Sequence, residues 1–309
     1  MRPARSIFNG CDLLAQLRHR AAERTFFCQG ITGIMDFPLI TSAQNEAVKH
    51  LVKLRDRRHR DREGVTLLEG YRELTRAREY GMTLVECFFS PEHFLGVNEM
   101  PLLESIAASG VPVRRLAPHL LEKVAYRDRP EGLLAIAGMR RHTLADLPFR
   151  PDGLYLVAET IEKPGNLGSM LRSADAVGAT GMIVCGHGTD IYNPNVIRAS
   201  TGALFSMPLA EGENAEVYDW LHGRGIKILA ATPHTDKCYA DTDMTCGVAI
   251  VVGAEQTGLT DFWMTRADLQ VVIPMLGRID SLNVAAATTI LLYEAARQRG
   301  FPVGGATAK

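Results

Sequence analysis

The 309-residue chain is poor in features that hold metals, disulfides or membranes. Its six cysteines form no CxxC pair and none neighbours a histidine, so neither a zinc site nor a disulfide framework is expected. No apolar run approaches the roughly 20 residues of a membrane-spanning helix. The scattered thiols suit a reducing compartment, and we expect a cytoplasmic protein without metal and without membrane attachment.

Motifs of several common enzyme classes are missing as well. The sequence contains no Walker lysine, no GxGxxG fingerprint and no pairing of His with Ser that would suggest a hydrolase. The composition itself, with 46% apolar and 22% charged residues, is typical of a globular protein. Any enzymatic function must therefore rest on a less common set of residues.

Charge is unevenly distributed, although the formal net charge is only −1. Residues 1–140 contain 21 Lys and Arg against 17 Asp and Glu, whereas residues 141–309 contain 13 against 18. The densest basic cluster is 49–62, where seven of fourteen residues are Lys or Arg. A solvated helix face followed by an exposed turn is the simpler interpretation, but we favour phosphate contact, since such clusters serve nucleic-acid binding. The predicted contacts are Arg55, Arg57, Arg58, Arg60 and Arg62.

Periodicity divides the chain into two parts. Residues 42–138 alternate between helical spacing and short apolar runs, which predicts a small α/β domain. Residues 139–152 lose this periodicity and contain two prolines, which indicates a linker. The first 34 residues hold five arginines but one serine and no apolar core, so we expect a loosely ordered extension rather than a targeting peptide. The predicted boundaries are 1–38 for the extension, 39–139 for the first domain, 140–152 for the linker and 153–309 for the second domain.

The second domain is predicted to contain a parallel sheet with helices on both faces. Val248–Val252 and Leu269–Ile273 are short, rich in β-branched residues and followed by glycine- or proline-bearing turns, as buried parallel strands are. Ser281 can cap a helix that begins at Leu282, and Asn166 can cap another that runs to about residue 177. The loop between the last strand and the last helix suits a ligand that is partly apolar and partly hydrogen-bonding.

Three segments of this domain resemble the signature motifs of the SpoU (TrmH-like) branch of the SPOUT RNA methyltransferases, in that family's order. KPGNLGSMLRSADAVGA (163–179) is similar to the first motif, VVGAEQTGL (251–259) to the second and IPMLGRIDSLNVAAATTILLYEA (273–295) to the third. LLEGYREL (67–74) resembles the substrate-binding domain that precedes the methyltransferase domain in this family. One departure is ValAlaAlaAla after SerLeuAsn, where the family often has ValSerValAla.

The resemblance implies a fold and an activity. The fold would be α/β, with a C-terminal parallel-sheet SPOUT domain that contains a deep trefoil knot, preceded by a small L30e-like α/β domain. The activity would be S-adenosylmethionine-dependent methylation of a ribose 2′-hydroxyl in RNA, by a homodimer formed through the C-terminal domain. The N-terminal domain favours ribosomal RNA. The alternatives are a tRNA ribose methyltransferase and a non-catalytic RNA-binding or ribosome-assembly protein that retains the knot as a scaffold.

The resemblance also implies site residues. The catalytic residues would be Asn166, Arg172, Ser281 and Asn283. The cofactor would be bound by Gly253, Ala254, Glu255, Gly258, Leu259, Ile273, Met275 and Leu282. Further RNA contacts would come from Arg72 and Arg198.

Several of these residues also have a structural interpretation. Asn166 and Ser281 could be helix caps and nothing more, and Glu255 could be a carboxylate near a helix start. Asn283 is harder to explain structurally, because an amide just inside an apolar helix is unfavourable unless it is hydrogen-bonded. Guanidinium groups stay protonated at neutral pH, so Arg172 is a poor general base and is better suited to binding a phosphate or polarising the hydroxyl.

Overall fold

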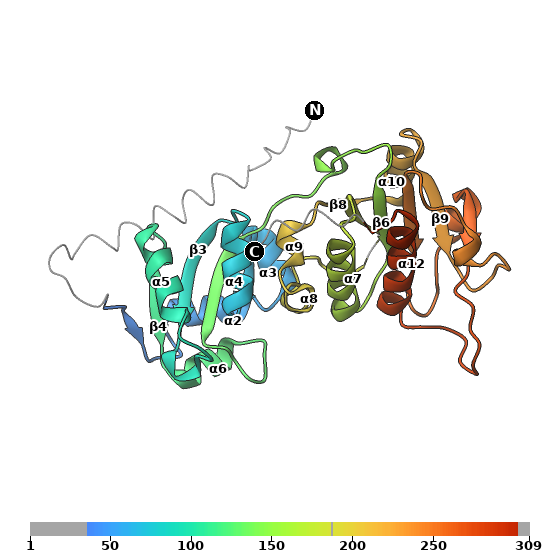
Figure 1. Ribbon diagram of the computed structural model, residues 1–309. Coiled ribbons are helices and arrows are strands. Elements are labelled where there is room, and N and C mark those ends of the chain that lie inside the picture. The colour runs from blue at the N-terminus through green and yellow to red at the C-terminus, as the bar shows by residue number, and fades with distance from the viewer. Residues whose placement is uncertain (1–35, 187, 302–309) are drawn as a thin grey trace, which may run out of the picture. The chain divides into compact units, whose positions relative to one another are not determined.

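The computed structural model describes residues 36–186 and 188–301 (Figure 1). The chain forms two compact units that divide between Arg140 and Arg141. The expected extension, residues 1–38, lies almost entirely outside the described residues. Among the helices that the structure describes, none combines the length and the apolar character needed to cross a membrane.

The first unit is built on a five-stranded mixed sheet with the strand order β1-β4-β3-β5-β2. Strand β5 runs antiparallel to β3 and β2, and the remaining pairs are parallel. Apolar side chains of α2 and α6 share one core with strand residues such as Leu67, Phe88 and Ile136. This confirms the predicted small α/β domain. Its elements are β1 Leu39–Ile40, α2 Glu46–Lys53, α3 Arg57–Glu63, β2 Val65–Glu69, α4 Tyr71–Glu79, β3 Leu84–Phe89, η1 Pro91–His93, α5 Glu99–Ala108, β4 Val113–Leu116, α6 Pro118–Val124 and β5 Leu133–Gly138.

The second unit contains a six-stranded sheet with the order β11-β9-β10-β6-β7-β8. Every neighbouring pair is parallel, as predicted. Its elements are η2 Leu144–Asp146, β6 Leu154–Glu159, α7 Pro164–Ala176, β7 Gly181–Cys185, α8 Pro194–Ser200, α9 Ala203–Ser206, β8 Leu209–Gly212, α10 Asn214–His222, β9 Lys227–Ala231, η3 Tyr239–Asp241, β10 Val248–Val252, α11 Asp261–Arg266, β11 Leu269–Val271 and α12 Val284–Gln298.

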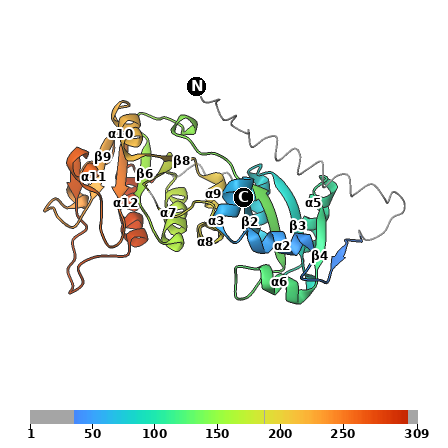
Figure 2. The same cartoon turned by 180° about the vertical axis from the view of Figure 1, so that it is seen from behind.

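Helices cover both faces of this sheet. Tyr155 and Val157 of β6 share a core with Trp220 of α10 and Trp263 of α11. On the other face α7 and α12 contact each other, and they also contact β7 and β10 respectively (Figures 1 and 2). Leu147 belongs to the core on the α10 face, so part of the segment that we expected to be a linker is packed into the second unit.

The strand order determines where a ligand can bind. From β6 the chain proceeds outward to β7 and then β8 at one edge of the sheet. On the other side of β6 the neighbouring strand is β10, and beyond it lie β9 and then β11 at the opposite edge. Open parallel sheets bind ligands at the carboxyl ends of their strands, next to the point where the winding direction changes. That point lies between β6 and β10. The loops after β6, β10 and β11 all leave this edge, and they are the loops that hold the three sequence motifs.

Two helices begin at residues other than those predicted. The N-cap of α12 is Asn283, whose Oδ1 accepts hydrogen bonds from the N–H groups of Ala285 at 3.0 Å and Ala286 at 3.3 Å. Ser281 therefore does not cap this helix. Helix α7 begins at Pro164, which suits the first position because it needs no N–H acceptor there. Asn166 consequently lies inside the first turn, where its side chain is free of the capping role.

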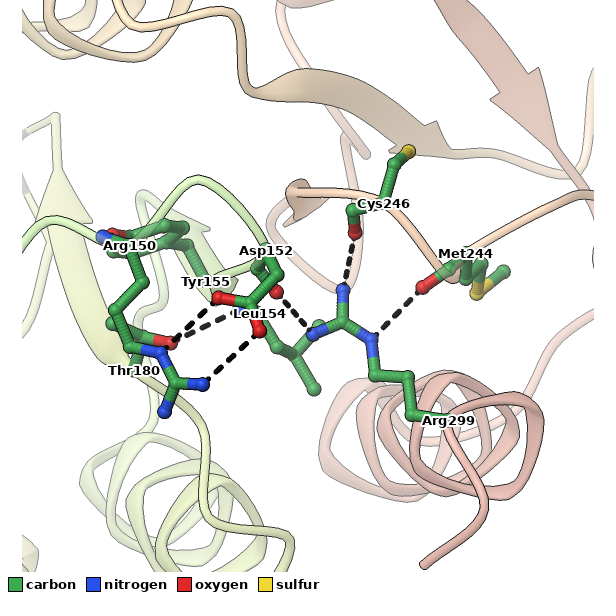
Figure 3. A network of polar contacts seen from close by, with 8 residues as sticks. All are labelled: Arg150, Asp152, Leu154, Tyr155, Thr180, Met244, Cys246 and Arg299. Carbon is green, nitrogen blue, oxygen red and sulfur yellow. Dashed lines mark hydrogen bonds and ion pairs between the residues drawn. The ribbon is translucent and has the colours of Figure 1, made fainter.

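The C-terminal end of α12 is tied to two loops by Arg299 (Figure 3). Its guanidinium donates to the carbonyl oxygens of Met244 at 2.9 Å, Asp152 at 2.7 Å and Cys246 at 2.5 Å. Burial lowers the pKa of Arg299, but a guanidinium still keeps its proton at neutral pH. Both ends of α12 are thus fixed, one by Asn283 and the other by Arg299.

The packing of α7 on α8 requires a glycine, which predicts the effect of Gly168→Ala. A Cβ atom at Gly168 would lie 2.5 Å from Cβ of Ala199 and 2.7 Å from the carbonyl oxygen of Val196. Because most of these neighbours are backbone atoms of α8, the substitution should lower the free energy of unfolding by about 1–3 kcal/mol.

Gly165→Ala, in the same helix, is the matched control. A Cβ atom there meets no atom within 4 Å, so this variant should unfold at the wild-type urea concentration or above it. The chain has two tryptophans, and both Trp220 and Trp263 lie in the second unit, so tryptophan fluorescence follows the unfolding of that unit. Equal unfolding midpoints for the two variants would contradict this account of the packing.

Candidate active site

Polar side chains from three loops meet at the carboxyl edge of the second sheet. Asn166 comes after β6, Glu255 after β10 and Asn283 after β11. Asn283 Nδ2 donates to Asn166 Oδ1 at 3.2 Å and to Glu255 Oε1 at 3.3 Å, and Asn166 Nδ2 also donates to Glu255 Oε1. The structure therefore brings together one predicted site residue from each of the three motifs.

Asn283 uses both ends of its amide. Its oxygen caps α12 through Ala285 and Ala286, and its nitrogen binds Asn166 and Glu255. We expected Asn283 to lie inside the helix, but it lies at the cap. A residue in this position couples the start of the last helix to the other two loops.

Lys163 is a fourth member of this group and was missed by the sequence analysis. Its Nζ forms an ion pair with Glu255 Oε2. The Lys163 side chain is 69% exposed and the Glu255 side chain is 22% exposed. The available signal was position, because Lys163 opens the first motif directly before the proline and glycine of its turn.

The loop after β10 folds back on itself. A Cβ atom at Gly253 would lie 2.3 Å from the carbonyl oxygen of Gly258 and 2.5 Å from the nitrogen of Leu259. Gly258 has a φ of 69° and donates from its N–H to the carbonyl of Ala254 at 2.9 Å. Gly253 is one of the predicted cofactor-binding residues, and in the structure a glycine at this position is required by the chain's own backbone. The tight turn places Glu255 at its tip.

A buried carboxylate fixes this turn to the sheet. Glu159, at the end of β6, is fully buried. It accepts hydrogen bonds from Thr260 N at 2.8 Å, Thr260 Oγ1 at 2.6 Å and Asn214 Nδ2 at 2.6 Å. Glu159 is not among the predicted site residues, although a carboxylate at the end of the apolar strand LYLVAE was a usable signal.

The loop after β11 has apolar side chains beside unpaired main chain. Ile273, Met275 and Leu282 are partly buried, whereas Leu276 is 97% exposed. Within the part of the chain that the structure describes, no backbone–backbone hydrogen bond involves residues 273–282. Apolar walls next to main-chain donors and acceptors are the combination that binds a flat heterocycle such as adenine.

Arg172 and Ser281 lie outside the polar group. Arg172 is exposed on α7, about 9 Å beyond Asn166 along the helix axis. Over residues 36–186 and 188–301, neither Arg172 nor Ser281 has a side-chain hydrogen bond or an ion pair. Asp175, three residues after Arg172 on the same helix, does not pair with it and accepts a hydrogen bond from Ser206 Oγ at 3.1 Å. The predicted roles of Arg172 and Ser281 stay predictions.

The basic cluster of the first unit forms α2 and a second short helix, α3. Asp56 caps α3 by accepting a hydrogen bond from Arg58 N at 2.8 Å. The guanidinium group of Arg55 lies over the ring of Tyr126, 5.3 Å from its centre, in a cation–π contact. The exposed arginines among the predicted RNA contacts are Arg55, Arg57, Arg58, Arg62, Arg72 and, in the second unit, Arg198.

Arg60 differs from the other arginines of this cluster. Its side chain is buried, with 2% exposure, and donates to the carbonyl oxygens of Leu54 and Arg55, each at 3.0 Å. These carbonyls end α2, so Arg60 binds that helix end. The prediction that Arg60 contacts phosphate is wrong, because its guanidinium is enclosed by the protein.

Among the described residues, no group of three or more His, Cys, Asp or Glu side chains is arranged to hold a metal ion. The only charged pair in the polar group is that of Lys163 with Glu255. The site therefore offers amide donors, one carboxylate and backbone groups. Such a set can position a reactant that is already activated.

Comparison with known proteins assigns both units. Residues 153–293 match the SpoU rRNA Methylase family, and residues 45–135 match the MRM3-like substrate binding domain. A 23S rRNA (uridine(2479)-2′-O)-methyltransferase of Streptomyces viridochromogenes is 35% identical over 276 residues, which are 87% of this chain and 94% of that protein. The chain belongs to the SpoU rRNA methylase family.

Solved structures agree with membership of the SpoU family. The crystal structure of an RNA 2′-O ribose methyltransferase shares 42% identity with a TM-score of 0.74, over 84% of this chain and 99% of that one. An AdoMet-bound rRNA methyltransferase from Sinorhizobium meliloti shares 29% identity with a TM-score of 0.77, over 84% and 98%. These findings confirm the predicted family and the α/β fold class. The knot stays a prediction.

The capping role of Asn283 predicts the stability of two variants. Asn283→Ala removes the acceptor for two N–H groups of α12 and should lower the free energy of unfolding by about 1 kcal/mol. Asn283→Ser keeps a capping oxygen but loses the links to Asn166 and Glu255, so its stability should lie between those of Asn283→Ala and wild type. Tryptophan fluorescence in urea measures both. A serine variant no more stable than the alanine variant would show that the cap contributes little.

Proposed function

We propose that this chain transfers a methyl group from S-adenosylmethionine to a ribose 2′-hydroxyl of ribosomal RNA. The observation that carries the proposal is the convergence of Asn166, Glu255 and Asn283, one from each motif, at the carboxyl edge of the sheet. The names of the Streptomyces relative and of the Sinorhizobium structure support the substrate class and the cofactor.

The residues of the last two loops fit S-adenosylmethionine. The loop after β11 offers partly buried apolar side chains and main-chain groups without a backbone partner, which suit the face and the edge of an adenine. The turn after β10 adds the Glu255 carboxylate, which is paired with Lys163. The residues that would hold the cofactor are Gly253, Ala254, Glu255, Gly258, Leu259, Ile273, Met275 and Leu282.

The chain's own contribution to the reaction is positioning. S-adenosylmethionine supplies, when bound, a sulfonium methyl group that is already activated for transfer. The protein then has to hold the ribose oxygen in line with that methyl group and exclude competing orientations. Asn166 and Asn283 supply amide donors for this, and Ser281 a hydroxyl. Of the four paired side chains, only the Glu255 carboxylate can accept a proton.

We assign Arg172 to the active site of a second copy of this chain. It lies outside the polar group of its own chain and has no ion-pair partner among the described residues. We propose a homodimer through the C-terminal domain, in which Arg172 of one subunit serves the site of the other. Since guanidinium groups stay protonated, Arg172 would bind a phosphate or polarise the hydroxyl rather than act as a base.

The contacts of residues 232–247 support the proposed trefoil knot. Tyr239 N donates to the carbonyl of Val272 at 3.0 Å, just before the last loop. Met244 N donates to Gln298 Oε1 at 2.8 Å, at the end of α12. One segment thus touches both ends of residues 272–299, as expected if that segment surrounds the final part of the chain.

The first unit is proposed to bind the RNA. Five exposed arginines, Arg55, Arg57, Arg58, Arg62 and Arg72, supply positive charge for phosphate contacts, and Arg198 adds a further contact in the second unit. The match of residues 45–135 to a substrate-binding domain supports this role. The 23S rRNA named for the Streptomyces relative favours ribosomal RNA over tRNA.

Mapping 2′-O-methylation across ribosomal RNA and tRNA in a deletion strain tests the substrate. We expect methylation to be lost in ribosomal RNA and restored by the wild-type gene. Loss in tRNA alone would favour a tRNA methyltransferase. Calorimetry with S-adenosylmethionine should show binding with a Kd of the order of micromolar, and no binding would favour a non-catalytic scaffold.

Arg172→Ala tests the catalytic role of the arginine. We expect kcat for RNA methylation to fall by about 100-fold, with the Kd for S-adenosylmethionine unchanged, because the lost group acts on the ribose or its phosphate. Arg150→Ala is the control, since Arg150 is exposed and pairs with Asp152 just before β6 begins, at the opposite edge of the sheet from the loops that hold the three motifs. Equal activity of the two variants would remove Arg172 from the mechanism.

A further inference from the structure

The Lys163 side chain is largely exposed, but it is bound to a residue of the proposed active site. It precedes Pro164 at the start of α7, but its side chain makes no capping hydrogen bond. Instead it extends to the loop after β10 and pairs with Glu255 Oε2. The ion pair therefore joins the loop after β6 to the turn after β10, in parallel with the hydrogen bond from Asn166 to Glu255.

The two oxygens of Glu255 have different partners. Oε1 accepts from Asn166 and Asn283, whereas Oε2 is paired with Lys163. A carboxylate held on both oxygens has a fixed plane, and Oε1 then points toward both amides. Without Lys163 the carboxylate could rotate about its last bond and exchange either amide for water.

The charge of Lys163 matters as well. Glu255 is the one carboxylate of a group that must receive a polyanion, and an uncompensated negative charge there would oppose the approach of phosphates. Lys163 neutralises it locally. The hydrogen bonds from neutral amides cannot do this.

We propose that Lys163 is a positioning residue of methyl transfer. It neutralises Glu255 and holds the carboxylate in the orientation that keeps Asn166 and Asn283 in place for the ribose. This inference rests on the proposed function. It assigns Lys163 no contact with the reacting atoms, and it requires that the effect of Lys163 passes through Glu255.

The test measures kcat and KM for the ribosomal RNA that the wild-type protein methylates. Lys163→Met should lower kcat about tenfold while KM for RNA stays within about twofold, because displaced reactants slow the chemical step without weakening RNA binding. Lys163→Arg, which keeps the charge, should recover most of the activity. Lys237→Met is the control, since Lys237 is exposed in the same unit and has no ion pair within the described chain.

A double-mutant cycle tests the route through Glu255. In a Glu255→Gln background, Lys163→Met should change kcat by less than about twofold, because the partner charge is already gone. Equal, multiplicative effects in both backgrounds would overturn the proposal. Urea unfolding followed by tryptophan fluorescence shows whether a lower kcat of Lys163→Met comes from unfolding of the protein. If it does, Lys163→Gln is used in place of Lys163→Met.

Two further outcomes would also overturn the role of Lys163. A raised KM for RNA with unchanged kcat would make Lys163 a phosphate contact, and wild-type kinetics for Lys163→Met would leave it without a role. Failure of the proposed function itself is distinct, because the wild-type protein would then transfer no methyl group to RNA in the same assay.

Discussion

The carboxylate of Glu255 joins three loops that are far apart in the sequence. It accepts from Asn166 and Asn283 and pairs with Lys163, so the ends of β6, β10 and β11 are connected through one side chain. These contacts lie at the surface, so they contribute mainly by fixing the orientation of the three loops relative to one another. The arrangement of the proposed cofactor and ribose sites depends on this connection.

Neighbouring residues also hold the turn after β10, which carries Glu255, in place. Gly253 and Gly258 let the loop after β10 double back within bonding distance of itself, and Glu159 anchors its far end to β6 through Thr260. The carboxylate at the tip is therefore presented by a backbone with little freedom. Binding sites held in this way need less reorganisation when a reactant arrives.

Much of the second unit could be predicted from local patterns. The strand Val248–Val252 was predicted with its observed bounds, because a short run of β-branched residues that ends in glycine has few other interpretations. Helix starts were less certain, since Ser281 and Asn283 are both good caps and only the folded chain selects between them. The convergence of the motifs needed the strand order, which periodicity does not reveal.

Charged residues were the hardest to assign from sequence. Arg60 and its neighbours look alike along the chain, and only the packing of α3 against the end of α2 separates the buried guanidinium from the exposed ones. Lys163 was overlooked for the converse reason, because its partner is almost a hundred positions away. In both cases the deciding contact is tertiary.

The two fixed ends of α12 set the length of that helix. Asn283 is bound at the first end to the loops of the proposed active site, and Arg299 at the other end is bound to three carbonyl oxygens. Adding or deleting one residue between them would rotate one end by about 100° and shift it by about 1.5 Å relative to the other. Relatives that keep both anchors should therefore vary in loop length elsewhere, while the number of residues in this helix stays constant.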